Sequence, residues 1–163
     1  AMPIEIERKF LVDGDAWRTG VRKRELFRQG YLGGSELCSA RVRVAGDTAW
    51  LGLKGRVQGA SRLEYEYEIP VHEGNEILER LCAGGRIEKW RHWVPHAGHE
   101  WEVDEFLGAN AGLIVAELEL DDEAEVFAHP SWLGAEVTHD GRYFNSWLAT
   151  HPWPEWRAQG SLP

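Results

Sequence analysis

Cysteine, methionine and long apolar runs are scarce in this sequence, and each scarcity excludes a class of protein. The 163 residues include two cysteines and one methionine. Cys38 and Cys82 could form at most one disulfide, and neither has the spacing of a metal or redox pair, so we expect buried thiols. No apolar run approaches the roughly 20 residues that a membrane-spanning helix needs, and no basic-then-apolar leader precedes the first expected strand. We therefore expect a cytoplasmic protein with no membrane partner.

Positive charge is also in the minority. The chain has 18 Lys and Arg residues against 27 Asp and Glu residues, which gives a formal net charge of −9. This balance argues against non-specific binding to nucleic acid, and we expect no nucleic-acid partner. Such a protein can hold a polyanion only if its basic side chains are gathered in one place. The chain length suits a single domain with a full hydrophobic core.

A two-residue alternation of apolar and polar side chains recurs along most of the chain, as is typical of half-buried β-strands. It predicts strands over about 4–12, 25–32, 36–44, 48–55, 62–71, 86–94, 100–106 and 113–120. Eight antiparallel strands favour a β-barrel, because closure leaves no unpaired strand edge. The predicted fold class is therefore α+β and mainly antiparallel β, with an eight-stranded barrel and a few outer helices.

Helical segments are expected to be few. Apolar residues at helical spacing predict a helix over 73–82, and a second is expected over 142–149. Short helical turns are expected at 13–19 and 131–134. The segment 151–163 carries Trp153 and Trp156 amid three prolines. We expect residues 2–150 to form the domain and residues 151–163 to form a tail that packs on the barrel or closes one end of it.

The polar faces of the expected strands carry an unusual amount of charge. A solvated outer surface is the competing interpretation, because ordinary antiparallel sheets also alternate. Here, however, like charges recur two residues apart, whereas a surface selected for solubility intersperses its signs. The pairs are Glu5/Glu7, Arg41/Arg43, Glu64/Glu66, Lys89/Arg91 and Glu117/Glu119. We therefore predict an inverted barrel, with charges inside and apolar residues outside beneath the helices.

A cavity lined by both signs of charge requires a ligand that also contains both. A polyphosphate with divalent cations meets this requirement. Arg and Lys bind phosphate oxygens, and paired carboxylates bind Mg²⁺ or Mn²⁺. Buried carboxylates without a cation would be costly, so a metal ion is expected.

The same residues form an ordered signature. Glu5-Ile6-Glu7-Arg8-Lys9 matches the pattern E-x-E-x-K, which is weak by itself. The match continues from there to about residue 149 through Gln29-Gly30-Tyr31-Leu32, Arg41-x-Arg43, Lys54, Arg62-x-Glu64-x-Glu66, Glu88-Lys89-x-Arg91, Trp101-Glu102-Val103-Asp104, Glu117-Leu118-Glu119 and Glu136-Val137-Thr138-His139-Asp140. As an ordered set it resembles the CYTH superfamily, the triphosphate tunnel metalloenzymes, in its short single-domain bacterial form.

The resemblance implies a barrel that binds a triphosphate with Mg²⁺ or Mn²⁺, and it implies roles position by position. The implied catalytic residues are Glu7, Lys9 and Lys89. The implied substrate-binding residues are Lys9, Arg41, Arg43, Lys54, Arg62, Lys89, Arg91 and Tyr31. The implied metal ligands are Glu5, Glu7, Glu64, Glu66, Asp104, Glu117, Glu119 and Asp140. Glu102 shares the same strand face without an assigned role.

We expect metal-dependent hydrolysis of a triphosphate, most simply inorganic tripolyphosphate to pyrophosphate and phosphate, by a two-metal mechanism. A class IV-type adenylate cyclase and a thiamine triphosphatase would use the same charged residues and stay open as alternatives. A polyphosphate-binding module without activity would keep the basic residues but could lose the carboxylates. The resemblance also suggests a homodimer.

Overall fold

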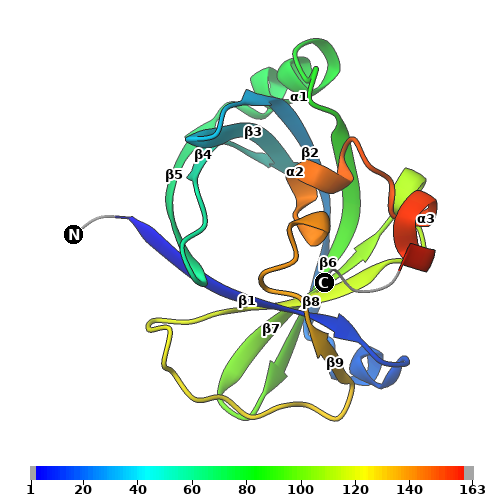
Figure 1. Cartoon of the computed structure of the whole chain (residues 1–163). Helices are drawn as coiled ribbons and strands as arrows, with labels where there is room; N and C mark the ends of the chain where they lie inside the picture. The colour runs from blue at the N-terminus through cyan, green and yellow to red at the C-terminus, as the bar shows by residue number, and fades with distance from the viewer. Residues whose placement is uncertain (1–2, 160–163) are drawn as a thin grey trace.

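The computed structural model describes residues 3–159, and its β-strands form one closed sheet (Figure 1). The strands are β1 (Ile4–Val12), β2 (Lys23–Gly34), β3 (Cys38–Ala45), β4 (Thr48–Gly55), β5 (Ser61–Ile69), β6 (Arg86–His96), β7 (His99–Phe106), β8 (Ile114–Glu119) and β9 (Leu133–Glu136). Their order is β5-β4-β3-β2-β6-β7-β8-β1-β9, and β1 also pairs with β5. That last pairing closes eight antiparallel strands into a barrel, which confirms the predicted fold class.

Strand β1 closes the barrel because it pairs with different strands along its length. Its first residues, Ile4 to Ile6, pair with β5, while residues 7–11 pair with β8 on the other side. Residues 10–12 then pair with the short strand β9, across a register shift. The helical turn expected at 131–134 is wrong for its second half: residues 131 and 132 form a turn, but Leu133–Glu136 is a strand that continues the edge of β1 beyond β5.

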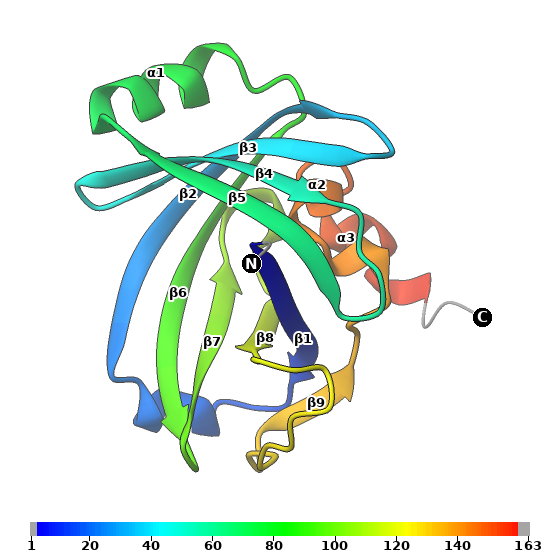
Figure 2. The same cartoon turned by 90° about the vertical axis from the view of Figure 1, so that its left-hand side faces the viewer.

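The helices lie outside the barrel wall and at one end of it (Figure 2). They are α1 (Val71–Arg80), α2 (Asn145–Leu148) and α3 (Trp153–Trp156), with 3₁₀ segments η1 (Ala16–Gly20), η2 (Gly108–Asn110), η3 (Gly141–Tyr143) and η4 (Arg157–Gln159). Helix α1 packs on the outer face of β3 and β4. A side chain at Gly74 would bring its Cβ to 2.6 Å from the Ala49 Cβ, so only glycine allows this close approach. The helix expected over 142–149 is shorter, since it is divided into η3 and α2.

The apolar core lies on the outside of the barrel, in three clusters beneath the covering segments. The first surrounds Trp17 and Trp101 under η1 and the segment that leads to β9. The second joins Leu148 and Trp156 to the wall, and the third lies under α1 around Val42. Period-two strands thus place their apolar residues outward, which leaves the alternate residues to face the interior.

Two further points concern expectations from composition. Cys38 is exposed and Cys82 is half-buried, so the prediction of two buried thiols is wrong for Cys38. Among the helices of residues 3–159, none has the length and hydropathy needed to cross a membrane.

Candidate active site

The barrel encloses a charged cavity of about 300 Å³. Strand register accounts for its lining, because inward residues of neighbouring strands are paired directly. Glu5 is opposite Arg62, and Lys9 is opposite Glu117. The lining residues are Glu5, Glu7, Lys9, Glu25, Phe27, Tyr31, Ser39, Arg41, Arg43, Trp50, Lys54, Arg62, Glu64, Glu66, Lys89, Arg91, Trp93, Glu102, Glu117, Glu119, Phe144, Asn145 and Ser146. The inverted arrangement expected from the like-charged pairs is the one that the structure has.

Three carboxylates gather on one side of this cavity and form what we call the acidic cluster, namely Glu5, Glu7 and Glu119. One ligand oxygen of each lies within 4.8 Å of the other two. Burial, and then the neighbouring carboxylates of Glu117 and Glu5, raise the pKa of Glu7 well above its ordinary range. At the more exposed rim, partial burial and the carboxylates of Glu102, Glu5 and Glu64 raise the pKa of Glu119 to about 7. Within residues 3–159, no basic side chain lies within 4.0 Å of the Glu7 or Glu119 carboxylate, so these two members of the cluster lack a cation that would compensate their ionised forms.

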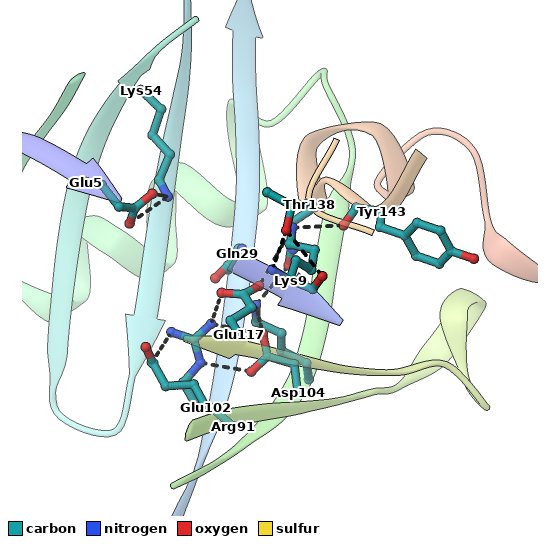
Figure 3. Close-up of polar contacts among 12 residues, drawn as sticks. Glu5, Lys9, Gln29, Lys54, Arg91, Glu102, Asp104, Glu117, Thr138 and Tyr143 are labelled. Carbon is teal, nitrogen blue, oxygen red and sulfur yellow. Dashed lines mark hydrogen bonds and ion pairs between the residues drawn. The ribbon is translucent and has the colours of Figure 1, made fainter. Parts of the chain in front are cut away.

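Glu5, the third member of the cluster, and the carboxylates beside it are paired with basic side chains. The Lys54 Nζ lies 3.1 Å from Glu5 (Figure 3) and 2.9 Å from Glu64. Although burial alone would raise it, Lys54 and Arg62 lower the pKa of Glu5 to about 2. Glu117 is likewise held below its ordinary pKa against the effect of burial, chiefly by Lys9 and the neighbouring cations of β6. Both groups are therefore ionised near neutral pH.

Arg43 differs from the other basic groups of the cavity. Its Nε donates to the Gln29 Oε1 at 2.7 Å, and within residues 3–159 no carboxylate oxygen lies within 4.0 Å of it. Burial, with the guanidinium groups of Arg41 and Arg91, lowers the pKa of Arg43 to about 10. The cavity thus contains an uncompensated cation as well as two carboxyl groups, Glu7 and Glu119, without a basic partner, and a metal–polyphosphate complex could neutralise both.

The segment around α2 reaches into one end of the barrel and contacts the basic groups. The Lys9 Nζ donates to the Tyr143 carbonyl oxygen at 3.2 Å, and the Lys89 Nζ donates to the Asn145 Oδ1 at 2.9 Å. The Phe144 ring lies 5.1 Å from the Lys9 ammonium. Figure 1 shows this segment crossing the ring of strands. The tail helix α3 holds it from outside, where Trp156 packs edge-on against Tyr143 and Trp147.

Most of the site residues expected from the sequence meet in the cavity, and two do not line it. Asp104 is 0% exposed and lies behind Lys89 and Arg91. Asp140 is turned away, because its carboxylate accepts from the backbone and side chain of Arg142, with an Nη2–Oδ2 distance of 2.7 Å. The structure therefore brings neither carboxylate to the acidic cluster, contrary to the metal-ligand expectation for both.

Several lining residues were not singled out from the sequence. Trp50, Trp93 and Phe27 share strand faces with Lys54, Arg91 and Gln29, so the alternation that identified the charges also placed these aromatic rings inside. Asn145 gave no comparable signal, because its position depends on how α2 folds back over the barrel.

The donor set fits a hard divalent cation. Mg²⁺ and Mn²⁺ bind carboxylate oxygens and retain water. The three converging carboxylates of the acidic cluster supply such oxygens. A soft metal would instead require thiolates or imidazoles, which the cavity lining lacks in the part of the chain that the structure describes.

Comparison with known proteins agrees with this geometry. The family model described as CYTH domain matches residues 3–144. The chain belongs to the CYTH domain family. CYTH triphosphate tunnel metalloenzymes are metal-dependent, as the acidic cluster also indicates for this CYTH protein.

Proteins named inorganic triphosphatase are similar to this chain in both sequence and structure. An inorganic triphosphatase of Acetivibrio thermocellus is 53% identical over 94% of this chain and 97% of its own length. An inorganic triphosphatase of Nitrosomonas europaea is 39% identical over 89% of this chain and 96% of its own. A crystal structure of an inorganic triphosphatase superposes with a TM-score of 0.62, at 35% identity, over 89% of this chain and 97% of that one.

Proposed function

We propose that this CYTH protein hydrolyses inorganic tripolyphosphate to pyrophosphate and phosphate with a divalent cation. The observation that carries the proposal is the meeting, in one cavity of about 300 Å³, of the acidic cluster with a set of converging basic side chains. Two relatives, at 53% and 39% identity, are named inorganic triphosphatases, which supports the same reaction.

In this reaction a water oxygen forms a bond to the terminal phosphorus while the bond from that phosphorus to the bridging oxygen breaks. The pyrophosphate leaves with the bonding electron pair, and the water loses a proton. We assign Glu7 to orient the water and accept that proton, because its carboxylate lies inside the acidic cluster. Lys9, Arg43 and Lys89 would hold the phosphates and offset charge on the leaving group.

We assign Glu5, Glu7 and Glu119 as the residues that hold the cation, with Glu117 beside them. A bound Mg²⁺ or Mn²⁺ supplies charge neutralisation and polarises phosphate oxygens. The two-metal arrangement implied by the resemblance stays a prediction, and so does the choice between the two ions. Counting bound Mn²⁺ per chain by titration would test the number directly.

Thiamine triphosphate is a second candidate substrate, and the aromatic lining is what favours it. The cavity lining includes Trp50, Trp93 and the carboxylate of Glu25. Aromatic faces and carboxylates can bind a cationic ring. Tripolyphosphate needs none of these three groups, so replacing both tryptophans separates the two candidates.

The test is phosphate release from tripolyphosphate, ATP and thiamine triphosphate, measured in parallel with Mg²⁺, Mn²⁺ or EDTA. We expect rapid release from tripolyphosphate that EDTA abolishes. Formation of cyclic AMP from ATP without phosphate release would instead identify a cyclase. No turnover of any of the three, with retained binding, would identify a polyphosphate-binding module and refute the proposal.

We also predict that the protein is cytoplasmic and that it forms a homodimer. Cell fractionation tests the first. Light scattering at several protein concentrations tests the second, where a constant monomer mass would contradict it.

A further inference from the structure

The carboxylate of Asp104 lies beneath the cavity floor and accepts three hydrogen bonds. Its Oδ2 accepts from the Lys89 Nζ at 2.6 Å and from the Arg91 Nη2 at 2.9 Å, and its Oδ1 accepts from the Arg91 Nε at 2.8 Å. Asp104 is 0% exposed and Lys89 is 1% exposed. Both carboxylate oxygens are thus occupied by cations of the neighbouring strand β6, which leaves Asp104 poorly placed to be a metal ligand.

All three nitrogens of Arg91 are occupied by carboxylates. Besides the two bonds to Asp104, the Nη1 lies 2.7 Å from Glu102 and the Nη2 lies 3.4 Å from Glu117. Figure 3 shows this guanidinium between the three carboxylates. These four contacts leave one N–H of the Nη1 for a phosphate, so Arg91 faces mainly the carboxylates. Arg43, whose guanidinium faces no carboxylate within 4.0 Å in the described chain, is the contrasting case.

We propose that Asp104 is a positioning residue, which directs Lys89 into the phosphate side of the cavity and Arg91 toward Glu102 and Glu117 on the carboxylate side. Asp104 thereby fixes the spacing between the phosphate-binding and cation-binding halves. The physical basis is the bidentate contact, in which two parallel N–H···O bonds set the plane of the guanidinium as well as its position. The proposal rests on the proposed function for its kinetic readout alone.

The decisive variant is Asp104→Asn, which keeps the shape of the side chain and removes its charge. Removing a negative charge would by itself strengthen the binding of a polyanion. A rise in the KM for tripolyphosphate therefore cannot come from the change in net charge. It would show that Lys89 and Arg91 have lost their positions. We expect the KM to rise about tenfold, the loss typical of one charge-assisted hydrogen bond. We also expect weaker Mn²⁺ binding in the absence of substrate, because Arg91, no longer anchored by Asp104, can pair more closely with Glu102 and Glu117 and compete with the cation for them.

The matched control is Glu105→Gln on the same strand. Glu105 also pairs with an arginine through two nitrogens, at 2.9 and 3.5 Å from Arg18, but on the outer face. This variant should leave the KM and the Mn²⁺ affinity at the wild-type values. An unchanged or lower KM in Asp104→Asn, together with wild-type Mn²⁺ affinity, overturns the proposal.

A second variant covers the case in which Asp104→Asn does not fold. Arg91→Lys keeps the charge but cannot make the bidentate contact with Asp104, so the cation is free to pair with Glu102 and Glu117; weaker Mn²⁺ binding is again expected, and wild-type affinity would overturn the proposal. Calorimetric titrations with Mn²⁺ alone, and with tripolyphosphate in EDTA, need no turnover. They therefore test the positioning role even if the wild-type protein fails to hydrolyse tripolyphosphate, which would refute the proposed function separately.

Discussion

Replacing Glu119 by glutamine should stabilise the metal-free protein at alkaline pH. Glu119 lies at the rim of the acidic cluster, where its surroundings raise its pKa from 4.5 to about 7. The folded state therefore binds a proton more tightly than the unfolded state does. The resulting loss of stability is absent below pH 4.5, grows between pH 4.5 and 7, and is complete above pH 7. Glutamine resembles the protonated acid and avoids that loss.

The expected magnitude follows from the size of this pKa change. At about 1.4 kcal/mol for each pKa unit, a fully buried group would cost about 3 kcal/mol. Glu119 is exposed at the rim, so solvent screening reduces the expected gain to about 1 kcal/mol. For a domain of this size, that gain corresponds to a melting temperature higher by about 2–4 °C.

The assay is thermal unfolding in EDTA at pH 8 and at pH 4.5, beside the exposed helix variant Glu76→Gln as a control. Glu119→Gln should exceed wild type at pH 8 and equal it at pH 4.5, while the control should match wild type at both. Adding Mn²⁺ at pH 8 should reverse the order, because the ion stabilises the protein that binds it more tightly. Equal melting temperatures at pH 8 in EDTA would refute the idea of uncompensated charge in the acidic cluster.

Four further predictions follow from the site. Glu7→Gln should lower kcat at least 100-fold while tripolyphosphate still binds in calorimetry; near-wild-type kcat would exclude Glu7 as the proton acceptor. Burial lowers the pKa of Lys89 to about 8, so its cation is lost above that pH and the KM for tripolyphosphate should rise between pH 7.5 and 9 in steady-state assays. Trp156→Ala should cost about 3 kcal/mol in urea unfolding, and it should raise the KM by loosening the segment that carries α2; an unchanged KM would limit α3 to a structural role. Asp140→Asn should leave Mn²⁺ affinity unchanged in titration, since its carboxylate faces Arg142 rather than the cavity.

Strand positions and the charged interior could be predicted because both depend on a local period of two. The sign pattern of Arg41 and Arg43, for example, identifies their shared face whatever the partner strand is. Strand β9 could not be predicted in the same way. Its four residues, Leu133–Glu136, are too few for an alternation, and they form a strand only because β1 presents a free edge beyond β5.

The same distinction separates the site residues. The alternation on β7 places Asp104 and Glu102 on the same inward face. The sequence does not reveal that the Asp104 carboxylate is bound by Lys89 and Arg91 and lies behind the cavity surface. Asp140 lies at the start of η3, where the nearby Arg142 competes for its carboxylate. Depth and local competition arise from tertiary packing, so a pattern of residue types alone cannot rank these carboxylates.

The position of β1 between β5 and β8 also bears on how the chain folds during synthesis. Glu7 pairs with Glu119 and Ile4 pairs with Leu63, so the first strand of the barrel finds its second neighbour only after more than a hundred further residues have been made. Contacts of such long sequence separation slow folding and prolong exposure of unpaired edges. Charged side chains on an unpaired strand discourage pairing with other chains, so during that interval we expect Glu5, Glu7 and Lys9 to disfavour such pairing of β1. By this reasoning, the residues assigned to chemistry in the finished barrel would also protect the nascent strand before the barrel exists.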